Sequence, residues 1–176
     1  MELVTLILGG ARSGKSAMAE RMIQRLRPPW TYIATAEALD EEMRVRIAEH
    51  RRRRGEGWVT VEAPLALPDA LTKAKGPVLV DCLTLWLTNL ILGERDHEAA
   101  AAALEQALQA RDAPTFLVAN EVGLGIVPEH ALGRLFRDAA GRLNQRLAAR
   151  AARVLFMVAG LPMTLKEPAP PRREHR

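Results

Sequence analysis

The chain is short of residues on which several protein classes depend. It has one cysteine, Cys82, in 176 residues, so an internal disulfide framework and a cysteine-based zinc site are excluded. Aromatic residues make up only 4% of the chain, too few for an obvious surface on which nucleic-acid bases could stack. The first apolar run breaks at Gly9 and has no basic segment before it, which argues against a signal peptide or a membrane span. We therefore expect a cytoplasmic protein.

The length and composition favour one domain. With 48% hydrophobic residues the chain can build one full core, and it is too short for two comfortable ones. The net charge of +4 arises largely from Arg51–Arg54 and from residues 172–176, which indicates local anion binding more than a nucleic-acid surface. We expect residues 1–166 to form a single domain and the Pro- and Arg-rich residues 167–176 to form a mobile tail.

The most informative segment matches the pattern G-x-x-x-x-G-K-[ST] and directly follows an apolar run at residues 3–8. A strand, a glycine-rich turn and a helix opened by Lys-Ser form a phosphate-binding loop, in which backbone N–H groups turn inward and the helix dipole adds positive potential. The lysine then contacts the β and γ oxygens of a nucleotide, and the serine holds Mg²⁺. The residues concerned are Gly9, Gly10, Ala11, Arg12, Ser13, Gly14, Lys15 and Ser16.

Apolar runs of strand length alternate with helical segments along the rest of the chain. The runs cover residues 3–8, 30–34, 77–80, 115–119 and 154–158, with a further strand at 58–61. Helices are expected at 17–26, 40–54, 98–111 and 129–150. This order predicts an α/β, P-loop (RecA-like), three-layer fold with a mainly parallel central sheet.

Asp81 ends the apolar run Val78–Val80, where P-loop proteins place an acid near Mg²⁺. Asp81 is therefore the second candidate magnesium ligand, beside Ser16. The alternative is an ordinary helix cap, because an apolar helical stretch follows it.

His50 lies in the expected charged helix and is followed by four arginines, Arg51, Arg52, Arg53 and Arg54. Positive charge nearby disfavours imidazolium and keeps the ring nucleophilic, while guanidinium groups can hold the phosphates of a nucleotide under attack. The alternative is a solvated surface histidine in a solvent-facing basic run, and the four arginines alternate around a helix, so they cannot all reach one ligand.

Two polar residues, Asn120 and Glu121, follow the strand at 115–119 and precede a glycine-rich, apolar loop. They stand at the edge of the sheet where ligands are expected and are candidates for contacting a substrate; equally, they could cap or turn the chain. Thr35 follows the second strand and has the same two interpretations.

Taken together, these segments resemble the bifunctional adenosylcobinamide kinase / adenosylcobinamide-phosphate guanylyltransferase family of cobalamin biosynthesis. The similarity includes the phosphate-binding loop, residues 32–36 and residues 40–43. Its most specific part is the pair of blocks at 120–128 and 136–147, and it covers residues 3–166.

The resemblance implies two reactions on one chain. A nucleoside triphosphate, ATP or GTP with Mg²⁺, phosphorylates the aminopropanol hydroxyl of adenosylcobinamide, and GMP is then transferred from GTP onto that phosphate. His50 matches the histidine that becomes guanylylated. The resemblance implies no tightly bound organic cofactor, no nucleic-acid partner and assembly into a trimer. Positions that match GTP contacts in the family are Ala34, Thr35, Ala36, Arg51, Arg52, Arg53, Arg54, Glu62 and Asp81.

Two positions depart from the family pattern. Asp81 stands where some relatives have glutamate, which shortens the side chain by one methylene and leaves open direct or water-mediated metal binding. Glu49 stands where another histidine can occur, and its carboxylate favours protonation of His50. Two other functions fit the same loop: a small-molecule kinase with no second reaction, and a nucleotide switch or nucleic-acid-stimulated ATPase.

Overall fold

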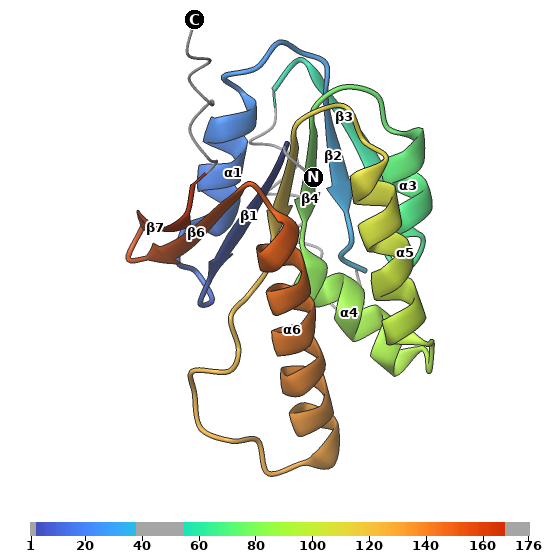
Figure 1. Cartoon of the computed structure of the whole chain (residues 1–176), viewed down its shortest axis with the longest axis vertical. Coiled ribbons are helices and arrows are strands. Elements are labelled where there is room, and N and C mark those ends of the chain that lie inside the picture. The colour runs from blue at the N-terminus through green and yellow to red at the C-terminus, as the bar shows by residue number, and fades with distance from the viewer. Residues whose placement is uncertain (1–2, 38–54, 168–176) are drawn as a thin grey trace, which may run out of the picture.

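The computed structural model describes residues 3–37 and 55–167, and its centre is a seven-stranded sheet (Figure 1). The strand order is β3-β2-β4-β5-β1-β6-β7, and all neighbouring pairs are parallel except β6 and β7. The strands are β1 (Val4–Gly9), β2 (Trp30–Ala34), β3 (Trp58–Glu62), β4 (Val78–Asp81), β5 (Thr115–Val118), β6 (Arg153–Val158) and β7 (Leu161–Lys166).

Helices cover both faces of this sheet. One face packs against α1, and the other packs against four helices (Figure 1). Strand β1 shows how the sequence achieves this, because Leu6 and Leu8 belong to one core cluster and Ile7, between them, belongs to the other. The helices are α1 (Lys15–Ile23), α3 (Leu67–Lys73), α4 (Leu83–Leu92), α5 (His97–Gln109) and α6 (Ala131–Arg150).

The expected α/β, three-layer fold with a mainly parallel sheet is confirmed. The six predicted strands are present, and three of the predicted helices correspond to α1, α5 and α6. The analysis missed α3 and β7. The predicted helix at 40–54 and the tail at 168–176 lie outside the described residues.

The start of the long helix α6 differs from the prediction in its position and packing. The helix begins at Ala131, two residues later than expected. Helical spacing in the sequence predicts one apolar side that carries Leu132, Leu135, Leu143 and Leu147. The first two are exposed, whereas the last two are buried. The first turns of α6 therefore extend beyond the core.

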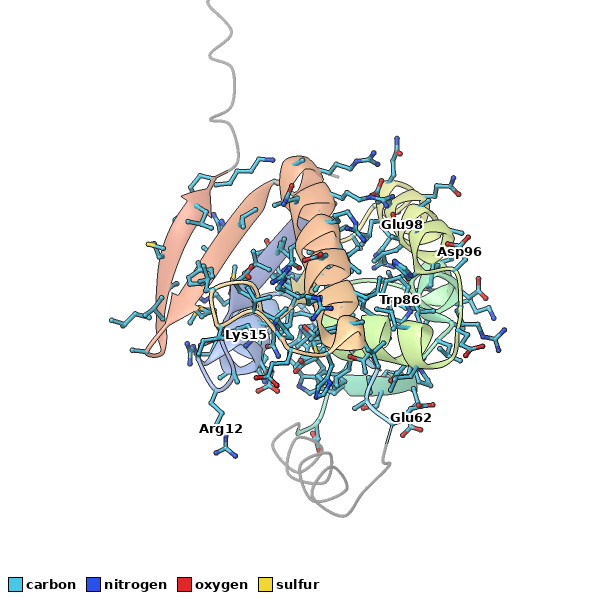
Figure 2. The ribbon with its side chains drawn as sticks, turned by 90° about the horizontal axis from the view of Figure 1, so that it is seen from below. Arg12, Lys15, Glu62, Trp86, Asp96 and Glu98 are labelled. Atoms are coloured by element: carbon cyan, nitrogen blue, oxygen red, sulfur yellow. The ribbon has the colours of Figure 1, made fainter. Side chains whose placement is uncertain are left out.

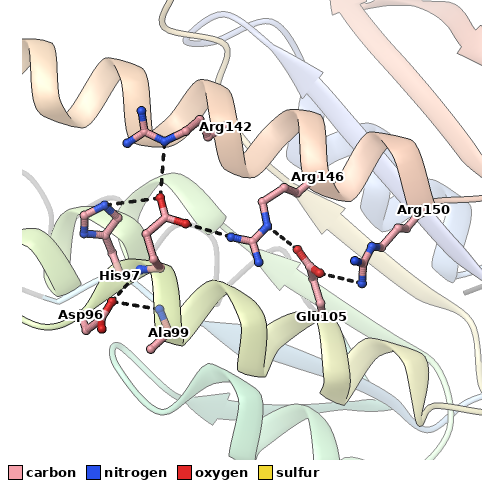
Figure 3. A network of polar contacts seen from close by, with 8 residues as sticks. Asp96, His97, Ala99, Glu105, Arg142, Arg146 and Arg150 are labelled. Atoms are coloured by element: carbon pink, nitrogen blue, oxygen red, sulfur yellow. Dashed lines mark hydrogen bonds and ion pairs between the residues drawn. The ribbon is translucent and has the colours of Figure 1, made fainter.

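Ion pairs join α5 to α6 along their length (Figure 3). The carboxylate of Glu105 is buried, and its two oxygens lie 2.5 Å and 2.6 Å from guanidinium nitrogens of Arg146 and Arg150. Glu98, which lies nearer the start of α5, is half exposed and pairs with Arg142 and Arg146. These ion pairs fix the position of α6 relative to α5.

Candidate functional site

The phosphate-binding loop has the backbone that its glycines predict. Gly9 has φ 147° and Gly14 has φ 95°, a region that side chains other than glycine rarely adopt. A Cβ on Gly9 would lie 2.6 Å from the carbonyl oxygen of Met157 on β6. The turn between β6 and β7 closes against the same loop: the Gly160 N–H donates to the Ser13 carbonyl at 3.1 Å.

Lys15 is directed over the loop. Its side chain is buried, and Nζ donates to the Gly10 carbonyl at 2.5 Å, whereas Arg12 points away from the body of the protein (Figure 2). Burial lowers the pKa of Lys15, and the neighbouring Cys82 and Asp81 oppose this effect. Lys15 and Asp81 therefore act on one another in a partly desolvated space.

The first turn of α1 is suited to an anion. The helix begins at Lys15, and neither a capping side chain nor an acidic residue occupies its first turn. Its first N–H groups and the positive end of its dipole remain directed toward the loop. The buried hydroxyl of Ser13 also has no hydrogen-bond partner within the described part of the chain. A phosphate group supplies acceptors for all of these donors.

Asp81 lies at the carboxyl end of β4, separated from β1 by β5 alone. Its Oδ2 accepts a hydrogen bond from the Tyr32 hydroxyl at 3.1 Å, which orients the carboxylate. The alternative role as a helix cap is not supported, because the N-cap of α4 is Cys82.

The donors near the loop fit Mg²⁺ delivered with a nucleotide. In such sites one or two protein oxygens complete a shell made mostly of phosphate and water. A serine hydroxyl and a carboxylate, Ser16 and Asp81, match this donor set. No group of three metal-ligating side chains occurs within residues 3–37 and 55–167, so the protein residues described do not form a metal cage of their own.

Cys82 is buried beside this site and is a free thiol. Burial raises the pKa of Cys82 to about 11, and the charge of Asp81 acts in the same direction; hydrogen bonds from Leu85 and Thr84 oppose them. Cys82 is therefore a neutral thiol under ordinary conditions.

Asn120 and Glu121 lie between the phosphate-binding loop and Asp81, because β5 separates β1 from β4. The Glu121 N–H donates to the carbonyl of Gly9 at 3.1 Å, so this segment continues the ladder onto the loop itself. The Glu121 carboxylate accepts from the Gly123 N–H at 2.6 Å. The contact with Gly123 corresponds to the chain-turning role considered for Glu121. The contact with Gly9 places the same residue beside the phosphate-binding loop.

The remaining predicted nucleotide contacts form a second group, on β2 and β3. Ala34 is paired with Glu62, and Thr35 and Ala36 follow directly. Since β3 is four strand spacings from β1, Glu62 lies about 19 Å along the sheet from the phosphate-binding loop. Lys15 and Glu62 are accordingly well separated in Figure 2.

Thr35 is fully buried, and its polar groups are engaged within the protein. Its hydroxyl donates to the Cys82 carbonyl at 2.7 Å and accepts from the Cys82 N–H at 2.8 Å. Its carbonyl accepts from the Asn89 side chain at 2.8 Å. The structure therefore gives Thr35 a role in joining the ends of β2 and β4.

His50 and the four arginines Arg51–Arg54 lie outside the described residues. The described chain stops at Glu37, just after the carboxyl end of β2, and resumes at Gly55, just before the amino end of the parallel strand β3.

The sequence analysis missed several polar residues of this edge, namely Tyr32, Thr84, Asn89 and Asn144. The partner of Tyr32, Asp81, is 49 residues away in the chain. Thr84, Asn89 and Asn144 lie on helices, and their partners are 24 to 54 residues away in the chain.

Comparisons with known proteins identify the family of the chain. The family model for cobinamide kinase / cobinamide phosphate guanyltransferase matches residues 5–165. A bifunctional adenosylcobalamin biosynthesis protein of Pseudomonas aeruginosa is 51% identical, over 92% of this chain and 96% of the relative. A protein of the same description from Salmonella typhimurium is 42% identical, over 93% and 100%.

Among solved structures, the RadB recombinase is similar at a TM-score of 0.48 and 15% identity, over 88% of this chain and 74% of that one. The family match spans the phosphate-binding loop, Asp81 and the segment after β5. The chain therefore belongs to the cobinamide kinase / cobinamide phosphate guanyltransferase family.

Proposed function

We propose that this protein phosphorylates adenosylcobinamide with ATP or GTP and then transfers GMP from GTP to the product, giving adenosylcobinamide-GDP. The observation that carries this proposal is the phosphate-binding loop with Lys15 and Asp81 facing one desolvated space, in a chain that matches the family over residues 5–165. Its substrates are small molecules, and no nucleic acid takes part.

In the kinase step, the oxygen of the aminopropanol hydroxyl attacks the γ-phosphorus, the bond to the β-phosphate oxygen breaks and the nucleoside diphosphate leaves. The N–H groups of residues 9–16 and the Lys15 ammonium stabilise negative charge on the transferred group. Mg²⁺, held by Ser16 and Asp81 when bound, neutralises further phosphate charge. Positioning supplies most of the acceleration, because phosphoryl transfer requires little covalent chemistry from the protein.

In the second step, a ring nitrogen of His50 attacks the α-phosphorus of GTP and pyrophosphate leaves, which gives a histidyl-GMP. An oxygen of adenosylcobinamide phosphate then attacks the same phosphorus, the N–P bond breaks and His50 is regenerated. Arg51, Arg52, Arg53 and Arg54 are proposed to bind the phosphates, with Ala34, Thr35, Ala36 and Glu62 nearby. Asn120 and Glu121 are proposed to contact the cobinamide.

We further infer that the enzyme is cytoplasmic and forms a homo-oligomer, a trimer. Its nucleotide substrates and its free, buried thiol support the compartment. Among residues 3–37 and 55–167, no helix combines the length and apolar character needed to cross a membrane. Exposed apolar residues after β5 and at the start of α6 support an association surface.

Labelling with GTP tests the second reaction. Incubation with α-labelled GTP and Mg²⁺ should leave acid-labile, alkali-stable label on the wild-type protein, and His50→Ala should abolish it. His97→Ala is the matched control, because His97 lies on α5 and contacts Glu98. Label that persists in His50→Ala would assign the nucleophile to another residue, and a wild type without label would leave only the kinase.

The kinase step is tested separately, with unphosphorylated adenosylcobinamide. Lys15→Ala should lower kcat/KM at least about 100-fold, since a charge that acts on the transferred group is lost. Lys73→Ala removes a lysine from the last turn of α3, away from the loop, and should have no effect. Near-wild-type turnover by Lys15→Ala would refute the role of the loop.

A further inference from the structure

The main-chain N–H and carbonyl of one residue at the ligand edge, Asn120, are each bonded to a side chain from a different helix. The N–H of Asn120 donates to the hydroxyl oxygen of Thr84 on α4 at 2.6 Å. The carbonyl of the same residue accepts from the side-chain amide of Asn144 on α6 at 3.3 Å. Asn120 lies beyond the end of β5 at Val118, and these two side chains satisfy its main-chain groups there.

The two holding residues are themselves fixed. Asn144 is buried on a helix whose axis is clamped to α5 by the Glu105 ion pairs. Thr84 stands in the first turn of α4, two residues after Cys82, and both the N–H and the carbonyl of Cys82 are bonded to the Thr35 hydroxyl. The main chain of Asn120 is therefore connected through side chains to the ends of β2 and β4 and to both helices.

The same segment is bonded directly to the phosphate-binding loop. The Glu121 N–H donates to the Gly9 carbonyl, and the Ala119 N–H donates to the carbonyl of Ile7, which also lies on β1. A shift of the Asn120 main chain would thus move Asn120 and Glu121 relative to the loop that binds the nucleotide. In a reaction that depends on alignment, displacement by about 1 Å can cost a large part of the rate or of productive binding.

We propose that Thr84 and Asn144 are positioning residues for the corrinoid substrate: by bonding to the main-chain N–H and carbonyl of Asn120, they set where Asn120 and Glu121 meet cobinamide. This inference rests on the proposed function, in which Asn120 and Glu121 contact that substrate. Neither Thr84 nor Asn144 touches a reacting atom. Their effect is carried by the geometry of the main chain between β5 and the glycine-rich loop.

The experiment compares Thr84→Val with Thr84→Ser in the full-length enzyme. Valine has nearly the shape of threonine but no hydroxyl, so the Asn120 N–H loses its acceptor, whereas serine keeps it. Thr84→Val should raise the KM for adenosylcobinamide about 10-fold or more while the KM for the nucleotide stays within about twofold. Thr84→Ser should restore most of the difference.

Matched controls come from the same helices. Thr88→Val removes a hydroxyl that donates to the Thr84 carbonyl within α4, and Gln145→Ala changes an exposed neighbour of Asn144. Both should behave like the wild type. Asn144→Ala should raise the KM for adenosylcobinamide as Thr84→Val does, and the double variant should show less than the product of the two effects, because both act on the main chain of one residue.

A merely structural role would give a different result. Loss of folded enzyme lowers kcat but leaves KM unchanged, so partly folded variants still report on the proposal. The inference is overturned if the KM for adenosylcobinamide does not change, if the nucleotide KM rises equally, or if serine is as harmful as valine. Labelling by GTP alone needs no cobinamide and should persist in every variant; failure of labelling in the wild type would instead count against the proposed function.

Discussion

Individual polar side chains hold the main chain at the ligand edge of this protein. The hydroxyl of Thr35 donates to the Cys82 carbonyl and accepts from the Cys82 N–H, and the side-chain amide of Asn89 donates to carbonyls after β2 and after β3. These contacts satisfy main-chain groups beyond the last ladder positions, where unpaired buried groups would cost about 1–3 kcal/mol each. Small polar side chains therefore determine the position of the loops that follow these strands.

The two glycines at the start of the phosphate-binding loop should respond differently to alanine. At Gly9, with φ 147°, an added Cβ meets the Met157 carbonyl and the Ser13 hydroxyl below 3.0 Å, whereas at Gly10 nothing lies within 4 Å. We expect Gly9→Ala to lower the free energy of unfolding by about 2 kcal/mol or more, and Gly10→Ala by less than about 1 kcal/mol. Thermal and urea unfolding would measure this; equal losses would contradict it.

The Cys82 thiol should make stability depend on alkaline pH. In the unfolded chain the thiol has a pKa near 9.0, whereas burial raises the native pKa to about 11, so the native state keeps its proton longer. This contribution is complete below pH 9 and is lost between pH 9 and 11, by roughly 3 kcal/mol at most.

Urea unfolding across this pH range would detect the effect. Cys82→Ala should show a shallower decrease in the free energy of unfolding than the wild type, since it lacks the titrating group. Parallel curves for the two proteins would show that the native thiol titrates near its ordinary pKa.

The chemistry of single residues could be predicted only where it is encoded locally. The loop with Lys15 and Ser16 is a contiguous motif, and Asp81 ends a recognisable apolar run, so both were identified from the sequence. Thr84 and Asn144 could not be, because their partner lies 36 and 24 residues away and depends on how two helices pack. Nor does a motif reveal that Thr35 is enclosed.

At the scale of elements, α6 depends on α5 through charges of unequal burial. Glu105 is 5% exposed between two arginines, whereas Glu98 is 53% exposed. Removing the buried carboxylate leaves Arg146 and Arg150 without the partner they share, although both side chains can still reach water.

We therefore expect Glu105→Ala to lower the free energy of unfolding by about 2 kcal/mol, and Glu98→Ala by less than about 1 kcal/mol. Urea unfolding of the two variants, each on one helix and with arginine partners on α6, makes a matched comparison. If Glu98→Ala costs as much as Glu105→Ala, burial does not determine the strength of these pairs.

The missed elements have physical explanations. Helix α3 has seven residues with a proline in its first turn, too short for a clear apolar period. Strand β7 contains Pro162, and its apolar and polar residues alternate only weakly. A proline is tolerated there because β7 is the edge strand of the described sheet, beside β6. Glu129 and His130 read as helical, yet His130 is the N-cap with extended backbone.

At the scale of the whole molecule, the strand order determines which residues meet. All parallel strands present their carboxyl ends on one edge, so the polar residues that follow β1, β4 and β5 gather there. The alternation of strands and helices predicted that edge, but it did not give the order. The placement of β5 between β1 and β4 is what brings Asn120 and Glu121 between the loop and Asp81.

The surface at the end of the β5–α6 connection should matter for assembly. Ile126 is 98% exposed, and Leu124 and Leu135 are exposed nearby in the sequence. We expect the wild type to sediment at three times the mass of one chain, and Ile126→Asp to shift the population toward the monomer, because a charge opposes burial of this surface.

Val59→Asp, at an exposed apolar residue of the edge strand β3, is the control and should remain assembled. A monomeric wild type would refute the trimer. Dissociation by Val59→Asp alone would place the contact on the opposite side of the sheet.

The turn at Gly160 supports the phosphate-binding loop, with its N–H on the Ser13 carbonyl and its Cα 3.2 Å from where a Cβ on Gly14 would lie. During translation the glycine-rich loop leaves the ribosome early, whereas this support is synthesised near the end. A nascent chain therefore carries the phosphate-binding loop long before Gly160 can support it. Nucleotide binding is then expected only late in the synthesis of the enzyme.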